Sequence, residues 1–272
     1  MRRRTLVIAL IVATGLATTA LAQRGRNRGG GGRFQQRFEP NASYDGAFRF
    51  CRIMFRQNPQ GDGAGWAVDY PRADINLPYR LSELTATSVS RDSNGNYNHA
   101  AFQLTDPELY HCPFIMMTEV GALYMDQQEA AALRDYLMKG GFLWADDFWG
   151  EYAWTVFRSE MSKALPEFQT VDLPLSHSLF HMLYQVEKVP QIPSINNWFG
   201  QGGSTSERGA DSAIPHARAI FNEHGDLMVL ITFNTDFGDA FEREGDNRAY
   251  FDTFAGVGYA FGINALLYSM SH

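Results

Sequence analysis

The chain has only two cysteines among its 272 residues, which limits the chemistry that sulfur can supply. Cys51 and Cys112 each begin an apolar stretch typical of an interior strand. We therefore expect two buried free thiols, with a disulfide as the alternative if the compartment is oxidising. The sequence around the two cysteines does not indicate the paired base that a catalytic thiol needs. Thiol catalysis is not predicted.

Acidic residues are absent before Glu39, although the chain has 30 of them. Eight of the 23 lysines and arginines precede Glu39, so the remainder carries 15 basic against 30 acidic side chains. This excess of negative charge argues against a nucleic-acid-binding domain, and we expect no nucleic acid partner. Roughly 230 residues are enough for one well-buried domain, which we place at 47–272.

The chain also lacks a long hydrophobic run near its start. The apolar stretch at 6–16 contains Thr14 and Gly15 and is shorter than the ~20 residues that a membrane span needs. Arginines precede it at 2–4, and Ala20-Leu21-Ala22 follows, as in a cleaved export signal. We expect cleavage near Ala22 and a periplasmic or secreted protein with no stable membrane span. A retained membrane anchor is the alternative.

The segment at 23–46 is expected to be a basic tail and linker. Its first part, 23–38, is rich in arginine and glycine and has almost no aliphatic side chains. Such a segment cannot bury enough apolar surface to offset the entropy of ordering. We expect this segment to be a solvated linker or to contact anionic polymers of the cell envelope.

Strand and helix patterns alternate along the rest of the chain. Apolar runs at 47–55, 113–118 and 142–145 predict strands, with a polar loop at 88–98. Asp74 is expected to cap a helix with Pro78 in its first turn, and Asp126 with Glu129 forms a capping box. Helical spacing recurs at 154–165, and a hairpin at 217–233 precedes a last helix at 248–270 in which Gly258 and Gly262 allow close packing on the sheet. The pattern predicts a doubly wound, mostly parallel α/β sheet with a C-terminal hairpin and a final packed helix.

Polar residues follow several of these predicted strands. In open α/β sheets, ligands bind beyond the carboxyl ends of the strands, so these residues form the candidate rim. The rim residues are Trp66, Asp69, Asp74, Thr118, Glu119, Asp146, Asp147, Trp149, Asn234, Asp236 and Asp239. Because a strand alternates its faces, we expect Asp147 to lie past the strand end, facing an acidic crevice beside Trp149.

Carboxylates that share a crevice repel one another unless a cation or an arginine compensates. Arg72 and Arg80 are the nearest arginines in sequence. Asn234, Asp236 and Asp239 have the spacing of a short loop for calcium or another divalent cation, although the ligand order is not that of an EF-hand. A capped turn is the alternative for that loop.

Two histidines and an excess of aromatic residues complete the candidates. His177 and His181 are four residues apart, a spacing that zinc sites use on helices, but no glutamate follows His177 as in the zincin motif. One buried and one surface histidine is the alternative. Aromatic side chains could stack against sugar rings or simply fill the core: Trp66, Phe148, Trp149, Tyr152 and Trp198.

Three separated motifs resemble domain-of-unknown-function family 4159. They are the segment at 66–76 (WAVDYPRADIN), the segment at 140–150 (GGFLWADDFWG) and Gly262-Ile263-Asn264 in the last helix. The resemblance implies a flavodoxin-like sheet similar to that of class I glutamine amidotransferases, in exported or membrane-attached bacterial proteins. Where those enzymes carry a catalytic cysteine, this sequence has Asp146 or Asp147, and no late His-x-Glu follows. Glutamine amidotransfer is therefore not expected.

Two functions of different classes fit these observations. The first is a non-catalytic envelope domain that binds a small polar ligand, a glycan or an envelope protein through the acidic rim, with Trp66, Asp69, Asp74, Arg80, Glu119 and Trp149 as binding residues. The second is a hydrolase, with a glycan as the candidate substrate, Asp146 or Asp147 as nucleophile or base, and His177 or His181 as proton-transfer partner. The first is favoured because the sequence offers no complete set of nucleophile, base and oxyanion donors.

Overall fold

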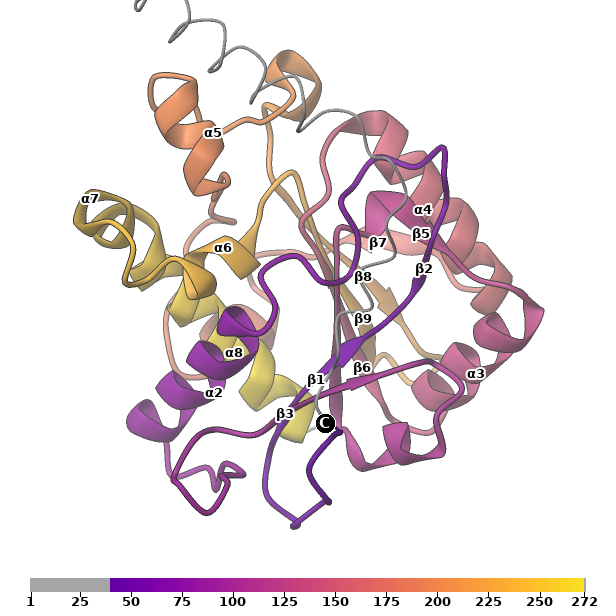
Figure 1. Cartoon of the computed structure of the whole chain (residues 1–272). Coiled ribbons are helices and arrows are strands. Elements are labelled where there is room, and N and C mark those ends of the chain that lie inside the picture. The colour runs from indigo at the N-terminus through magenta and orange to yellow at the C-terminus, as the bar shows by residue number, and fades with distance from the viewer. Residues whose placement is uncertain (1–39, 272) are drawn as a thin grey trace, which may run out of the picture. The chain divides into compact units, whose positions relative to one another are not determined.

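A computed structural model describes residues 40–271 of the chain. The expected signal peptide at 1–22, and the expected tail as far as residue 39, lie outside the described residues. From Asn41 onward the chain forms one compact unit. A seven-stranded sheet of order β3-β1-β4-β6-β9-β8-β7 lies at its centre (Figure 1).

Five neighbouring strands of this sheet run parallel: β3 (His99–Phe102), β1 (Phe50–Ile53), β4 (Phe114–Thr118), β6 (Phe142–Asp146) and β9 (Leu227–Phe233). The hairpin partner of β9, β8 (His216–Phe221), is antiparallel to it, and the edge strand β7 (Thr170–Asp172) is antiparallel to β8. A separate ribbon pairs β2 (Arg56–Gln57) with β5 (Leu123–Tyr124). The expected α/β class and the hairpin are confirmed as a mixed, mostly parallel sheet.

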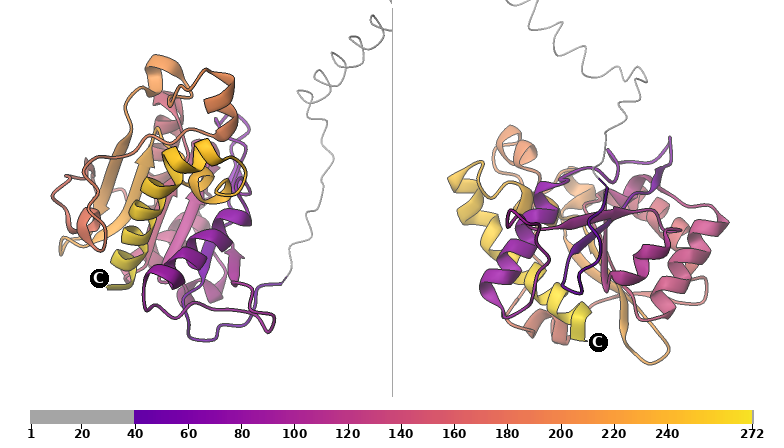
Figure 2. Two further views of the ribbon diagram at one scale, coloured as in Figure 1. Left: turned by 90° about the vertical axis from the view of Figure 1, so that its left-hand side faces the viewer. Right: turned by 60° about the horizontal axis from the view of Figure 1, so that its bottom comes forward.

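The sheet is covered by helices on both faces (Figures 1 and 2). One face carries α2 (Arg72–Leu84), α6 (Phe237–Glu242) and α8 (Gly256–Ser271), and the other carries α3 (Gln127–Met138) and α4 (Gly150–Ala164). Strand β6 shows why both layers form, because all five of its residues are buried. Phe142 and Trp144 pack into the core on the α2 side, whereas Leu143 and Ala145 pack into the core on the α3 side.

Shorter helical segments complete the fold. They are η1 (Pro107–His111), η2 (Val120–Ala122), η3 (Ser178–His181), α5 (Ile195–Gly200), η4 (Gly209–Ser212), α7 (Arg248–Tyr250) and the π-helical turn η5 (Phe251–Ala255). The segment at 195–213 contains α5 and η4, and α5 begins where Ser194 accepts a hydrogen bond from the Asn197 amide. None of the helices within residues 40–271 is both long and apolar enough to span a bilayer.

Local sequence signals account well for α3 and only partly for the last helix. The capping box of Asp126 and Glu129 forms as predicted at the start of α3. At 248–270 the expected single helix is divided by the π-helical turn. Gly262 does allow close packing, but against helices rather than the sheet: a Cβ atom there would lie 2.8 Å from Phe241 Cζ and 3.0 Å from Leu77 Cδ1.

The predicted start of the first helix was wrong. Helix α2 starts at Arg72 with Pro71 as its N-cap, so Asp74 lies inside the first turn and Pro78 inside the helix. Asp74 does not cap the helix because its carboxylate accepts hydrogen bonds from the buried Arg52 guanidinium. The edge strand β3, which follows the polar loop, was not predicted. Its four residues are too few to show the alternation of apolar and polar side chains that is typical of a strand.

The preferred interpretation of the cysteines was also wrong. Both side chains are buried, as expected, but Cys51 and Cys112 form a disulfide with a Cα separation of 6.2 Å. Cys51 lies within β1, and Cys112 ends η1 just before β4. Because β1 and β4 are neighbours in the sheet, the disulfide joins two adjacent parallel strands near the starting end of β4.

We expect the double variant Cys51→Ala with Cys112→Ala to lose stability. The cysteines are 61 residues apart, and closing a loop of that length restricts the unfolded chain by about 4 kcal/mol in the chain-entropy model. Urea unfolding measures the change, and adding a reductant to the native protein should produce a similar loss. Equal unfolding free energies for native and variant proteins would show that the thiols are not joined in solution.

Candidate functional site

A polar row crosses the carboxyl ends of four neighbouring strands on the α2 side of the sheet. It consists of Arg52 in β1, Thr118 in β4, Asp146 in β6 and Thr232 in β9, all fully buried. Asp146 accepts hydrogen bonds from the Thr232 hydroxyl and from the backbone amides of Phe237 and Gly238 at the start of α6. The last residue of β6 thereby ties the sheet to the N-terminus of α6.

The chain turns sharply just beyond this row. Glu119 follows β4, Asp147 follows β6 and Asn234 follows β9, and each adopts the left-handed backbone conformation, with φ of 55°, 55° and 60°. Asp69 has the same conformation, with φ of 62°. This conformation costs a non-glycine residue about 1 kcal/mol or more, and it tends to occur where function requires it. Four such residues at one rim mark the rim as the candidate site.

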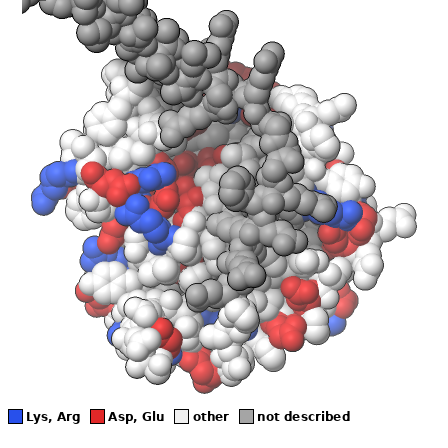
Figure 3. All heavy atoms as spheres, in the orientation of Figure 1, with Lys and Arg blue, Asp and Glu red and all other residues white. Residues whose placement is uncertain are grey.

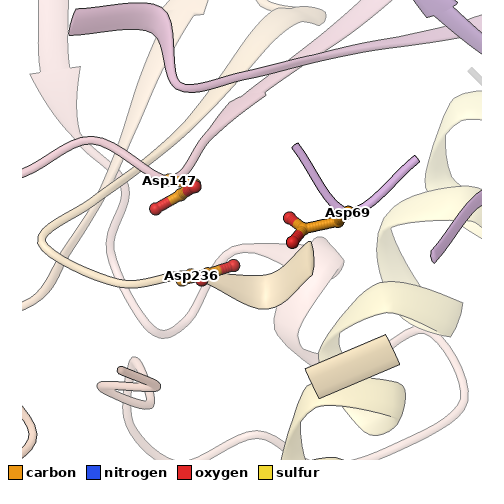
Figure 4. A group of neighbouring side chains, drawn as sticks. All are labelled: Asp69, Asp147 and Asp236. Atoms are coloured by element: carbon orange, nitrogen blue, oxygen red, sulfur yellow. The ribbon is translucent and has the colours of Figure 1, made fainter. Parts of the chain in front are cut away.

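Three aspartates at this rim point toward a common space from separate segments (Figure 4). Each of Asp69, Asp147 and Asp236 has a carboxylate oxygen within 4.8 Å of one from each of the other two. The three residues are only 6%, 5% and 2% exposed. We call them the acidic triad.

A buried ion pair positions the segment that carries Asp69. Arg52 Nε lies 2.9 Å and 3.0 Å from the two carboxylate oxygens of Asp74 in α2. Its Nη1 donates to the carbonyl oxygens of Trp66, at 3.3 Å, and Val68, at 3.1 Å. A single side chain from β1 thus holds both the chain just before Asp69 and the helix just after it.

Asn234 positions the segment that carries Asp147. Its Oδ1 accepts a hydrogen bond from the Gly150 amide at 2.9 Å, and its backbone amide donates to the Phe148 carbonyl at 3.0 Å. Within this segment, Trp149 Nε1 donates to Asp147 Oδ1 at 3.0 Å. Asp147 therefore lies past the end of β6, beside Trp149, as the alternation of the strand predicted.

The third member of the triad starts helix α6. Asp236 is the N-cap, and its Oδ1 accepts a hydrogen bond from the Asp239 amide at 2.7 Å. Gly238, in the first turn, leaves room for the Asp69 carboxylate, because a Cβ atom there would lie 2.1 Å from Asp69 Oδ2. The bare backbone of Gly238 is needed for this contact rather than for an unusual φ angle.

A second acidic group shares Asp69 with the triad. Asp69, Asp239 and Glu242 also bring one carboxylate oxygen each within 4.8 Å of the others. Here a positive charge is already present, because Arg243 Nε lies 3.3 Å from Asp239 Oδ1 and 2.7 Å from Glu242 Oε2. Figure 3 shows carboxylates and basic side chains next to one another on the face of the molecule that Figure 1 presents.

Burial raises the pKa of every member of the triad well above the ordinary aspartate range. The next largest influence is a neighbouring carboxylate in each case: Asp239 for Asp69, Glu119 for Asp147, and Asp147 for Asp236. Arg52 lowers the pKa of Asp69 in part, but the strongest charges acting on Asp147 and Asp236 are all negative. Ionising the whole triad therefore requires a positive charge that its neighbours do not supply.

Two further carboxyl groups at the rim have raised pKa values. Burial raises the pKa of Asp146 to about 7, against the opposing effect of the Thr232 hydroxyl. Burial also raises the pKa of Glu119 to about 7, while the Ala64 backbone amide lowers it in part. Both groups can therefore exchange protons near neutral pH.

Buried oxygens without hydrogen bonds gather at the same rim. Among residues 40–271, the buried side-chain oxygens that lack a hydrogen-bond partner are Asp69 Oδ2, Thr118 Oγ1 and Glu242 Oε2. Glu242 Oε2 still has the nearby charge of Arg243, but Asp69 Oδ2 belongs to the triad and has no such partner. A buried carboxylate oxygen without a donor is costly unless something else binds it.

The structure separates the predicted rim residues into two sets. It brings Asp69, Asp147 and Asp236 together, with Glu119 and Asp239 at their flanks. The predicted calcium loop is different: Asn234 is committed to backbone groups, and Asp236 and Asp239 belong to different acidic groups. Trp66 and Trp149 flank Asp69 and Asp147 in sequence, and Trp149 contacts Asp147 directly.

Asp74 and the two predicted compensating arginines form their direct ion pairs with other residues. The Asp74 carboxylate is fully buried against Arg52. Arg80 pairs with Glu83 and Glu244, and Arg72 pairs with Asp246. Arg52 and Arg243 act on the acidic groups, and Arg72 also lowers the pKa of Glu242 in part.

The two histidines lie at the other end of the sheet. His177 caps η3, and its ring contacts Phe221 and Tyr268. Tyr268 in turn contacts Phe142, the first residue of β6, whereas Asp146 is the last. A five-residue strand separates these ends by about 13 Å. The structure therefore does not bring His177 to Asp146.

His181 ends the same short helix and bonds locally. Its ring nitrogens lie 2.7 Å from Gln185 Oε1 and 2.7 Å from the Leu175 carbonyl oxygen. The helix η3 is a single 3-10 turn, so the predicted pairing of His177 with His181 on one α-helical face does not form.

Sequence reasoning missed four residues that shape the site: Arg52, Gly238, Glu242 and Arg243. Arg52 did carry a signal, since an arginine within an apolar strand must be paired when it is buried. Gly238 carried none, because its role depends on Asp69, which is far away in the chain.

A family model matches residues 52–270, and its description is Domain of unknown function (DUF4159). No curated protein matches the chain. The match includes all members of both acidic groups.

We expect the variant Asp147→Asn to be more stable than the native protein at pH 8 in a metal-free buffer. The pKa of Asp147 is raised in the folded state, so the unfolded chain ionises first and native stability falls as the pH rises above about 4. Asparagine removes this loss, so the variant's advantage should grow from pH 4 to pH 8 and vanish near pH 4.

Urea unfolding across this pH range measures the difference. Asp135→Asn is a suitable control, because Asp135 is exposed and pairs with Lys139 outside the acidic groups. A loss of stability in Asp147→Asn that is the same at every pH would show that Asp147 serves only as a structural acceptor.

Proposed function

Because the chain belongs to the family DUF4159, whose description assigns no activity, we propose a function from the site alone. The protein is a non-catalytic binding domain that holds a hard divalent cation, such as calcium, in the acidic triad and takes a polar ligand there. Its export to the periplasm or the medium is part of the proposal.

One observation supports the cation more than any other. Three carboxylates from three segments lie together almost without exposure, and one of their oxygens, Asp69 Oδ2, is buried without a hydrogen bond. Such an arrangement is costly in the empty protein. A bound dication would remove the mutual repulsion and supply the missing partner.

The spacing of the oxygens is suitable for one ion. Calcium binds its oxygen ligands at about 2.4 Å, so two ligands of the same ion are at most about 4.8 Å apart. The triad oxygens lie within 4.8 Å of one another. The ligands are carboxylates, which hard cations prefer over the nitrogen and sulfur ligands of zinc sites.

The charge of the site selects among ligands. Three carboxylates and one dication leave a net negative charge, and Glu119 and Glu207 add to the negative field at Asp147. Such a site disfavours anions and suits neutral groups rich in oxygen, such as the hydroxyls of a glycan. Trp149 is only 4% exposed and donates a hydrogen bond to Asp147, so it positions that carboxylate rather than stacking on a ligand. An envelope protein that presents similar groups is the alternative partner.

A hydrolase is the second candidate function, and it depends on Glu119. This residue follows β4 as Asp147 follows β6, and it is the strongest charged neighbour of Asp147. In a hydrolase Glu119 would take the place of His177 or His181 as the group that accepts a proton from water. Turnover of glycoside or ester substrates that is lost in Glu119→Gln would favour this function over binding alone.

The finer fold assignment remains a prediction. The central parallel strands and the sharp turn at Asp147 after β6 are consistent with a flavodoxin-like or glutamine-amidotransferase-like sheet. A similar fold does not assign an activity to the site, because function depends on the residues that a fold carries.

We expect calcium, magnesium or manganese to raise the melting temperature of the metal-free protein. At about a hundred times its dissociation constant, a cation adds about 2.7 kcal/mol, or about 5 to 10 °C for a domain of this size. Asp236→Asn should abolish most of the rise, and Asp135→Asn should retain it. The cation proposal fails if none of the three ions shifts the native melting curve.

The variant Gly238→Ala tests the geometry without changing the charge. The added Cβ would lie 2.1 Å from Asp69 Oδ2, so the carboxylate must move and cation affinity should fall at least tenfold. Gly245→Ala is the matched control, because its Cβ would have no neighbour within 4 Å. Isothermal titration of both variants with the same cation measures the effect. Equal affinities in the two variants would mean that Asp69 is not a ligand.

A further inference from the structure

We propose that Asp69, Asp239 and Glu242 form a second position for a divalent cation, and that the guanidinium of Arg243 fills this position in the native protein. The inference rests on the proposed function, because the second position shares Asp69 with the cation in the triad. Arg243 thereby limits the site to one metal ion.

The carboxylate oxygens of the second acidic group are as close to one another as those of the triad. Its three carboxylate oxygens lie within 4.8 Å of one another, and Asp69 contributes to both groups. Two of its oxygens, Asp69 Oδ2 and Glu242 Oε2, are buried without a hydrogen bond. Two cations that share a carboxylate are a common arrangement in metalloproteins. The fold therefore brings together side-chain carboxylates for two ions rather than one.

The second group has a positive charge in direct contact with two of its carboxylates. Arg243 Nε lies 3.3 Å from Asp239 Oδ1 and 2.7 Å from Glu242 Oε2, while its Nη1 donates to Asp246. By contrast, the charges that act most strongly on Asp147 and Asp236 are carboxylates. A cation that enters the native protein thus finds Asp147 and Asp236 uncompensated and the second group already neutralised in part.

The position of Arg243 makes it replaceable by an ion. It is the C-cap residue of α6, and its side chain is 30% exposed, so the guanidinium can be removed without opening the core. The backbone amide of residue 243, which donates to the Asp239 carbonyl, remains in any substitution except proline. Removing the side chain alone leaves the three carboxylates facing an empty position.

The test counts bound metal ions in Arg243→Gln. Native protein and variant are dialysed to equilibrium against manganese, and the bound metal is measured per chain. Arg248→Gln is the matched control, since it removes the same charge from an exposed arginine that pairs with Asp252 outside both acidic groups. We expect one ion in the native protein, two in Arg243→Gln and one in Arg248→Gln. Adding Glu242→Gln to the Arg243→Gln variant should return the count to one.

The melting temperature supplies a second measurement. Without metal, Arg243→Gln should melt below the native protein, because its carboxylates lose their counter-charge, and manganese should raise its melting temperature more than that of the native protein. A variant that folds only when manganese is present supports the proposal in the same way.

The outcomes separate this inference from the proposed function. One ion in every variant, with equal thermal shifts, overturns the second position but leaves the triad as a cation site. Two ions in the native protein show that Arg243 does not exclude the second ion, and they overturn its role. No bound ion in any of the proteins overturns the proposed function and the inference together.

Discussion

Mutual repulsion among buried carboxylates is the constraint on which the rest of this structure depends. Asp69, Asp147 and Asp236 are placed together at the carboxyl ends of the parallel strands with almost no exposure to water. Repulsion of this kind pushes such groups apart or forces them to bind protons. They stay together because each is held by a different backbone segment whose other contacts are strong, and one of these segments is fixed by the Arg52–Asp74 ion pair.

The disulfide contributes to this rigidity from the opposite face of the sheet. Cys51 and Arg52 are adjacent in β1, so their side chains point to opposite faces. Cys51 is joined to Cys112 on the α3 side, whereas Arg52 reaches Asp74 and the Val68 carbonyl on the α2 side. Strand β1, which positions Asp69, is therefore held by a disulfide on one face and by an ion pair on the other. A buried ion pair adds little net stability by itself, so its value here lies in fixing the position of one segment.

The sequence predicted those parts of the fold that depend on neighbouring residues. The capping box of α3, the buried strand β6 and the hairpin of β8 and β9 were each visible within a few positions. The alternation of β6 also placed Asp147 past the strand end. The composition of the acidic triad was not predictable in the same way, because Asp69, Asp147 and Asp236 come from segments that meet only in the folded chain. The sequence placed all three at the rim but assigned the cation to Asn234, Asp236 and Asp239, whose closeness in the chain made them look like one loop.

The two acidic groups show two solutions to one electrostatic problem. In the group of Asp69, Asp239 and Glu242, a guanidinium that belongs to the chain lies against the carboxylates of Asp239 and Glu242. In the triad, Arg52 acts on Asp69 alone, and the strongest charges on Asp147 and Asp236 are all negative, although the same helix α6 supplies residues to both groups. If the carboxylates served only the stability of the fold, an arginine for the triad, or neutral side chains in its place, would be less costly. A site that leaves one group uncompensated while compensating its neighbour is better explained by a positive charge that comes from outside the chain.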